Sequence, residues 1–316
     1  MKNIRTDLAI EARELYSTDG GQIPGVTTEN EEIDGINIDR VHVLSSIGEQ
    51  RIGKPVGNYV TLESMYIRER DPEFEEKLSF RLSQEIRNLV SIDKNTSVLI
   101  VGLGNWNITP DSLGPKVVDR IMVTRHLLEL IPDKVDERVH SVCAISPGVL
   151  GITGIETGEI IRGVIEKIRP DVVIAIDALA SRRTSRIGVT IQLADTGISP
   201  GSGIGNKRMA LTKETLGADT IAIGVPTVVY AHTIGRDTIK LIHDSNIQIG
   251  SDINFMSEEQ LDAMLNQILS ENMGDLVVTP KDVDIMIDNI AGIIADGINL
   301  AVHDNITLDE IRTFLH

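Results

Sequence analysis

The sequence predicts an α/β fold: a three-layer αβα arrangement with a mostly parallel sheet, an irregular N-terminal region and a helical C-terminal region. Two observations support this prediction. Short, continuous apolar runs are typical of strands buried on both faces, and apolar residues at spacings of three and four are typical of amphipathic helices. From residue 97 onward the two kinds of segment alternate, which indicates a parallel sheet covered by helices on both sides.

The first 95 residues lack this alternation. Residues 18–36 mix Gly, Asp, Glu and Thr with little periodicity, and this mixture predicts loop with short strands. Asp71 and Pro72 then open a helix that we expect from about residue 73 to 90. Its apolar residues form one stripe, namely Phe74, Leu78, Leu82, Ile86 and Leu89.

The predicted α/β core extends from about residue 96 to 255. Its strands are expected at 97–101, 139–144, 171–176, 187–193 and 220–225, the last ending at Pro226. Its helices are expected at 114–130, where Pro115 fits a first turn, and at 157–168. C-terminal helices follow from about 256 to 316, with amphipathic segments at 258–271 and 283–302.

Composition and charge restrict the function. Of 316 residues, 41% are hydrophobic and 24% charged, as in ordinary soluble proteins. The net charge of −17 repels polyanions, so we expect no direct binding to nucleic acid. The single cysteine, Cys143, cannot form an internal disulfide, which indicates an intracellular protein. The N-terminus has no apolar run typical of a signal peptide, and no run reaches the roughly 18 apolar residues of a membrane span.

Two acidic residues follow predicted strands. Asp111 lies in the loop 102–115 after the first strand, and Asp177 comes directly after the strand 171–176. Ligands of open parallel sheets bind beyond the carboxyl ends of the strands, so these two carboxylates are candidates for an acid–base pair that shares a water molecule. The structural alternatives are that Asp111 caps the helix near Gly114 and that Asp177 accepts hydrogen bonds from loop amides.

Other motifs give weaker signals. Gly102-Leu103-Gly104 lacks the third glycine of a dinucleotide-binding loop, because Asn107 stands there, and we expect no cofactor. Asp195-Thr196-Gly197 matches the tripeptide of pepsin-like proteases, which are two-lobed β-proteins with two such motifs. The glycine-rich loop 200–206 is either a phosphate-binding nest or a flexible loop beside the cleft. The histidines form no metal-binding cluster, and only His232 is considered as a ligand.

Taken together, several segments resemble the spore germination proteases, the endopeptidases that degrade small acid-soluble spore proteins. The similarity covers most of the chain in the expected order, and the chain is also distantly similar to the hydrogenase maturation proteases. The matching segments are 5–11, 102–115 with Thr109-Pro110-Asp111, 175–180, 195–197 with Pro200-Gly201-Ser202-Gly203, and 224–229.

The resemblance implies an atypical aspartic endopeptidase with Asp111 and Asp177 as its catalytic pair. It also implies a cytoplasmic homotetramer of the spore core, made as a zymogen that removes its own prosegment. Substrates of the family are cut after an acidic residue and before an apolar residue and Ala, a pattern that Asp7-Leu8-Ala9 fits. We therefore expect self-cleavage between Asp7 and Leu8, favoured by mild acid, with residues 1–7 as prosegment and 8–316 as a single peptidase domain.

Two further groups of residues are expected near the substrate. Backbone N–H groups around Gly102, Gly104 and Asn105 are candidates for stabilising the oxyanion. Gly201, Ser202 and Gly203 are candidates for a substrate loop.

Two other classes of function stay open. A metal-dependent hydrolase of the maturation-protease type would use Asp111, Asp177 and His232, and it would lose activity on chelation. A non-enzymatic α/β binding module would use the loop 201–206 and bind a nucleotide or peptide without turnover.

Overall fold

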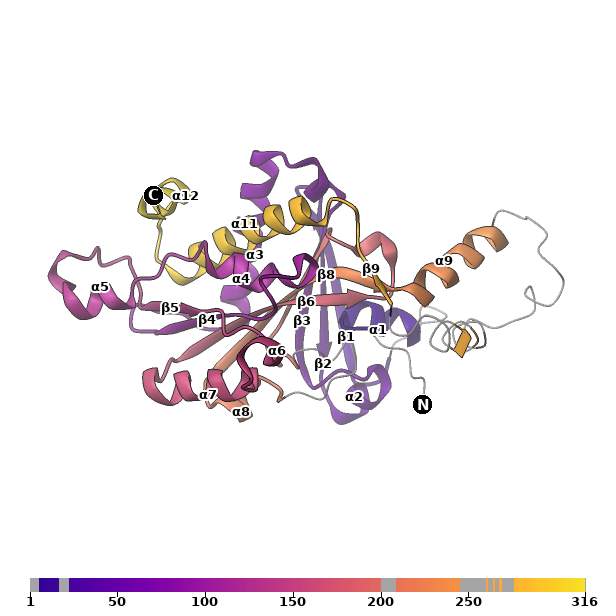
Figure 1. The fold of residues 1–316 in the computed structure, drawn as a ribbon, viewed down its shortest axis with the longest axis horizontal. Helices are drawn as coiled ribbons and strands as arrows, with labels where there is room; N and C mark the ends of the chain where they lie inside the picture. Colours follow the sequence, from indigo (N-terminus) through magenta and orange to yellow (C-terminus); the bar gives the residue numbers. More distant parts are fainter. Residues whose placement is uncertain are drawn as a thin grey trace.

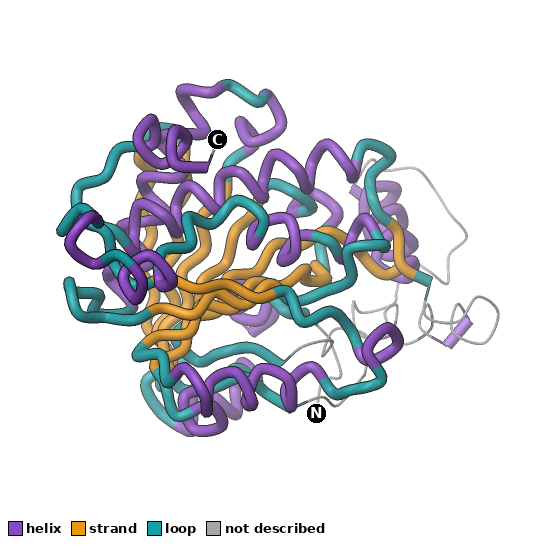
Figure 2. The backbone as a smooth tube through the Cα atoms, turned by 60° about the vertical axis from the view of Figure 1, so that its left-hand side comes forward, coloured by secondary structure: helices purple, strands orange, loops and turns teal. Residues whose placement is uncertain are grey.

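A mixed sheet of nine strands lies between layers of helices in the part of the chain that the computed structural model describes (Figures 1 and 2). Described are residues 6–16, 23–199, 209–244 and 276–315, with Gln260, Met264, Gln267 and Ile268 between them. The predicted α/β fold is confirmed, but the sheet is mixed rather than mostly parallel.

The strands follow the order β1-β2-β3-β7-β8-β6-β4-β5, with β9 paired to β8. The four strands β5, β4, β6 and β8 are parallel, and the remaining pairs are antiparallel. The strands are β1 (Val26–Ile33), β2 (Ile36–Val43), β3 (Gly57–Glu63), β4 (Val98–Gly102), β5 (Val142–Ile145), β6 (Val172–Ser181), β7 (Thr190–Ala194), β8 (Asp219–Tyr230) and β9 (Val277–Val278).

Much of the N-terminal region is regular, contrary to the sequence prediction. β1, β2 and β3 form an antiparallel extension of the sheet. The prediction failed at β1 because this edge strand is largely exposed and polar, so it lacks an apolar pattern. The signal that was missed is the turn Asp34-Gly35, where φ is 56° and 78°. Left-handed residues at both positions are the usual turn of a two-residue hairpin.

Helices cover both faces of the sheet. The apolar side chains of β4 alternate, so that Val98 and Ile100 pack in the layer of α3 and α11, while Leu99 and Val101 pack with α7. The α-helices are α1 (Ala9–Tyr16), α2 (Ser46–Ile52), α3 (Pro72–Leu89), α4 (Leu113–Val118), α5 (Arg125–Leu130), α6 (Leu150–Thr153), α7 (Thr157–Ile168), α8 (Lys213–Leu216), α9 (Ala231–Asp244), α11 (Val283–Val302) and α12 (Leu308–Leu315). Short 3₁₀ helices are η1 (Met65–Glu69), η2 (Thr109–Asp111), η3 (Pro132–Lys134) and η4 (Thr184–Arg186).

The predicted helix 114–130 is interrupted. α4 ends at Val118 and α5 begins at Arg125, because the chain between them bonds to other elements. The N–H of Met122 donates to the side chain of Asn299 on α11 (3.0 Å), and that of Thr124 donates to the carbonyl of Val142 (2.9 Å). Tertiary hydrogen bonds here override the helical pattern.

Two strands are longer than predicted. β6 extends to Ser181, and β8 continues through Pro226 to Tyr230. Proline is tolerated because the register between the two strands shifts there: Leu179 is opposite Pro226, and Ala180 is opposite Val228. The extension of β6 carries Asp177 within the strand.

α11 is a core helix. By length and composition it is the one helix among the described residues that could cross a membrane, but 61% of its most apolar window is buried inside the molecule. It packs against α3 and α4. The helix predicted at 283–302 is therefore confirmed, and Asp284, Asp288 and Asp296 interrupt its apolar sequence. The predicted helix 258–271 lies almost entirely outside the described residues.

The end of α11 supplies a buried histidine whose titration affects stability. His303 is fully buried, and its Nδ1 accepts a hydrogen bond from the N–H of His140 (3.1 Å). Burial, with a smaller contribution from His140, lowers the pKa of His303 from 6.5 to about 4. Between these pH values the unfolded chain binds a proton that the folded chain excludes, so stability falls as pH falls.

We predict that this group removes about 3 kcal/mol from the free energy of unfolding as pH falls from 6.5 to about 4. His303→Asn should lose that part of the pH dependence, because its amide oxygen can accept the same hydrogen bond without titrating. Urea unfolding at several pH values measures the difference, with the exposed His126→Asn as control. Equal pH dependence of His303→Asn and the wild type would contradict the prediction.

Candidate active site

Asp111 and Asp177 line one cavity of about 640 Å³ at the carboxyl ends of β4 and β6. β4 lies between β5 and β6, and the connecting helices α4 and α7 pack on opposite faces of the sheet. The cavity is therefore at the point where the strand order reverses, which is the usual ligand site of open α/β sheets. Both acidic residues that were expected beyond the strand ends therefore line this cavity.

The loop after β4 folds back to bring Asp111 over the strand ends. The N–H of Asn105 donates to the carbonyl of Asp111 (3.0 Å). Gly104, at φ 113°, passes so close that a Cβ atom there would lie 2.0 Å from the same carbonyl oxygen. Only glycine fits this position. Asp111 does not cap α4, because Ser112 is the N-cap residue.

Asp177 lies within β6 and is 7% exposed. Its Oδ1 accepts a hydrogen bond from the N–H of Ala178 (2.9 Å), so part of the structural alternative also holds. β4 pairs with β6 only as far as Ile176. Asp177 is thus the first residue of β6 beyond the end of its neighbour, and its side chain lines the cavity.

The N-terminal segment occupies the next part of this strand edge. Asp7 pairs with Ala180: its N–H donates to the carbonyl of Ala180 (3.5 Å), and its Oδ2 accepts from the N–H of Ala180 (2.9 Å). Asp7 also lines the cavity that Asp111 and Asp177 line. The first residue of the predicted processing site therefore lies in the same cavity as the predicted catalytic pair.

Two side chains that the sequence analysis missed hold the carbonyl of Asp7. Lys54, from the loop between α2 and β3, donates to this oxygen at 2.8 Å and to the carbonyl of Thr6 at 3.1 Å. Gln192 of β7 donates to it through Nε2 at 3.2 Å, while its Oε1 accepts from the N–H of Ala9 at 2.6 Å. Lys54 belongs to no motif, but a glutamine inside the apolar run Ile191-Gln192-Leu193 was a readable signal of a buried polar role.

The residues after Asp7 are buried. Leu8 is fully buried in a small cluster with Ile10 and Leu179. Ala9 is fully buried in another cluster, which includes Tyr59 and Ala194. The bond between Asp7 and Leu8 therefore joins a polar residue in the cavity to an apolar residue beneath it.

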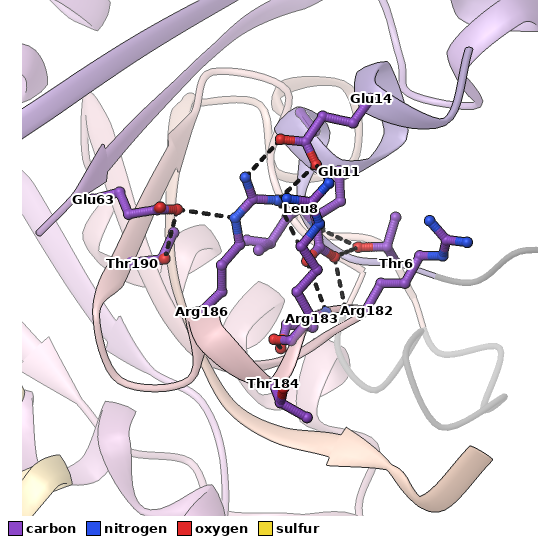
Figure 3. Close-up of polar contacts among 12 residues, drawn as sticks. Thr6, Leu8, Glu11, Glu14, Glu63, Arg182, Arg183, Thr184, Arg186 and Thr190 are labelled. Atoms are coloured by element: carbon purple, nitrogen blue, oxygen red, sulfur yellow. Dashed lines mark hydrogen bonds and ion pairs between the residues drawn. The ribbon is translucent and has the colours of Figure 1, made fainter. Parts of the chain in front are cut away.

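A cluster of charges fixes α1 after this bond (Figure 3). Glu11, 2% exposed, accepts hydrogen bonds from the hydroxyl of Thr6 and from the N–H groups of Arg182 (2.7 Å) and Arg183 (3.0 Å). Arg186, 5% exposed, lies 3.5 Å from Glu11 and donates to Glu14 at 2.8 Å. On its other side it donates to Glu63 of β3 at 2.9 Å.

The other candidate residues are less engaged. Of Gly102, Gly104 and Asn105, only Gly104 is among the described residues that line the cavity. Gly102 allows close packing, since a Cβ atom there would lie 2.2 Å from the carbonyl oxygen of Gly114. Asp195 accepts two hydrogen bonds from Asn58, at 2.7 and 2.5 Å, which tie the end of β7 to β3.

Three candidates are not fully described. Gly201, Ser202 and Gly203 lie outside the described residues, as does the side chain of His232, whose backbone belongs to α9. Among the residues whose side chains are described, no group of three or more His, Cys, Asp or Glu is arranged to hold a metal ion.

Comparison with known proteins shows the family of the chain. The family model described as germination protease matches residues 5–252 and 244–315. A germination protease of Clostridium tetani is 48% identical over 99% of this chain and 100% of its own length. Those of Caldanaerobacter subterraneus and Bacillus cereus are 50% and 41% identical over 99% of this chain, and over 98% and 97% of their own lengths. The chain belongs to the germination protease family.

Proposed function

We propose that this protease is an atypical aspartic endopeptidase made as a zymogen, which cleaves its own chain between Asp7 and Leu8 with water activated by Asp111 and Asp177. The observation that carries the proposal is that Asp7 lines the same cavity as both carboxylates. The carbonyl of the bond to be broken is held by two donors, and the residues after it are anchored by packing and by ion pairs. These contacts support the proposal that the segment is bound as a substrate.

The chemistry requires one ionised and one protonated carboxyl group. The ionised one takes a proton from water as the water oxygen bonds to the carbonyl carbon of Asp7, and the carbonyl π electrons move onto oxygen. When the carbonyl re-forms, the bond to the nitrogen of Leu8 breaks. The protonated partner supplies its proton either to the carbonyl oxygen or to this leaving nitrogen. A pair that shares one proton loses it as pH rises, so mild acid favours cleavage.

The same site is proposed to act on small acid-soluble spore proteins during germination. Asp7-Leu8-Ala9 serves as the internal example of a cleavage site with an acidic residue, an apolar residue and Ala. The net charge of −17 favours an enzyme that meets DNA-binding substrates as they dissociate from DNA rather than one that binds DNA itself. Assembly as a homotetramer and location in the spore core belong to the same proposal.

Substitution of either carboxylate tests the proposal. Purified full-length protein at mildly acidic pH should lose residues 1–7, as followed by intact mass. Asp111→Asn and Asp177→Asn should each slow this loss about 10³-fold or more, because neither variant has an acid–base pair. Asp133→Asn, which removes an exposed carboxylate of η3, should process at the wild-type rate.

Two controls separate the alternatives. A first-order rate that is independent of protein concentration would support cleavage within one chain. Self-cleavage that continues in the presence of a chelator would support a carboxylate mechanism. Loss of self-cleavage in the chelator would favour the metal-dependent alternative. Processing of both asparagine variants at the wild-type rate would sink the assignment of the catalytic pair.

The charge cluster around Glu11 gives a separate prediction. Glu11→Gln weakens the contact to Arg186 and the two backbone N–H groups that anchor α1, so the bond after Asp7 loses its fixed position. We expect self-cleavage to slow by about 10- to 100-fold while the fold is retained. The comparison is with Glu29→Gln, which removes the same charge from an exposed position of β1. Equal rates in the two variants would mean that the cluster does not position the bond.

A further inference from the structure

We propose that Lys54 and Gln192 are catalytic residues that bind the oxyanion formed at the carbonyl oxygen of Asp7. This inference rests on the proposed cleavage between Asp7 and Leu8 and deepens it. The geometry that supports it is the convergence of Lys54 Nζ and Gln192 Nε2 on one oxygen, at 2.8 and 3.2 Å. That oxygen belongs to the bond proposed to break.

The two donors come from different elements and contact the oxygen independently. Lys54 follows α2 and precedes β3, and Gln192 belongs to the buried strand β7. A hydrogen bond to a carbonyl becomes stronger as negative charge develops on its oxygen. Donors that already contact the carbonyl in the bound state would therefore stabilise the tetrahedral intermediate more than the starting peptide.

The environment of Lys54 strengthens this effect. Burial lowers the pKa of its ammonium group, against the carboxylates of Asp7 and Glu11, which raise it. A cation withdrawn from water interacts more strongly with a developing anion than the same cation would in bulk solvent. Lys54 is the charged member of the pair, and Gln192 is the neutral, directional one.

Gln192 is oriented by the segment itself. Its Oε1 accepts the N–H of Ala9 at 2.6 Å, which fixes the amide so that Nε2 points toward the carbonyl of Asp7. The same side chain thus contacts the backbone on both sides of the bond between Asp7 and Leu8. A peptide must be bound in the correct register for both hydrogen bonds to form.

Lys54 and Gln192 replace the backbone oxyanion donors that were expected from the sequence. Their role also decides where the proton of the Asp111/Asp177 pair goes. The N–H of Asn105 already donates to the carbonyl of Asp111. If Lys54 and Gln192 stabilise the oxyanion, the protonated carboxyl group of the Asp111/Asp177 pair need not protonate the carbonyl oxygen. Its proton then goes to the nitrogen of Leu8 as the carbon–nitrogen bond breaks.

The test uses the full-length chain and follows its intact mass. Lys54→Met should slow self-cleavage by about 10²- to 10³-fold, the usual effect of losing one oxyanion donor. Lys54→Arg, which keeps a cationic donor, should recover part of the rate. In Lys54→Ala, added ethylammonium should accelerate cleavage, whereas ethanol at the same concentration should not. Lys94→Met is the matched control at an exposed lysine and should cleave as the wild type does.

A merely structural role is separated by hydrogen–deuterium exchange. Residues 6–16 should stay as protected in Lys54→Met as in Asp111→Asn, which keeps the segment bound but uncleaved. Slow cleavage together with lost protection would overturn the proposal, because Lys54 would then only hold the segment. If Lys54→Met fails to fold, Gln192→Glu tests the proposal instead. This variant keeps an acceptor for the N–H of Ala9 but loses the donor to the carbonyl of Asp7, so its self-cleavage should be slowed as much as is expected for Lys54→Met.

The failures can be told apart. A wild-type chain that never cleaves would sink the proposed self-cleavage, and the oxyanion role with it. A wild type that cleaves, an inactive Asp111→Asn and a fully active Lys54→Met would overturn only the role of Lys54 and Gln192.

Discussion

The site depends on one interruption in the sheet: β4 ends at Gly102, while its parallel partner β6 continues to Ser181. The backbone of β6 beyond Ile176 therefore needs partners other than β4, since buried peptide groups must be hydrogen-bonded. Asp7 satisfies part of this edge by pairing with Ala180. The loop that carries Asp111 closes over the adjacent space. The difference in length between β4 and β6 thus leaves space for the cavity and brings Asp177 to its wall. It also leaves the end of β6 available to bind the N-terminal segment.

The parts of this site that could be predicted were those with a local signal. A buried apolar run that ends in Asp177 indicated a strand end, and the loop with Asp111 followed another such run. Because the carboxyl ends of parallel strands lie at one edge, these two residues were expected to meet. Asp7 and Leu8 came from a resemblance in sequence rather than from any pattern of burial.

Other parts could not be predicted because they depend on distant contacts. β1 is polar and exposed, and it exists as a strand through its pairing with β2. The break between α4 and α5 depends on Asn299, far along the chain. Lys54 has no neighbours in sequence that suggest chemistry, and the role proposed for it follows only from which carbonyl its ammonium group contacts.

The burial of Leu8 explains why cleavage at this bond would be hard to reverse. In the intact chain Leu8 contributes an apolar side chain to a buried cluster with Ile10 and Leu179. Cleavage before Leu8 would create an amine there, next to the apolar contacts. An unpaired ammonium is costly to bury, so the new terminus would favour leaving the site for water. Departure of residues 1–7 would break the contacts of Lys54 Nζ and Gln192 Nε2 with the carbonyl of Asp7 and free both donors for the carbonyl of another peptide.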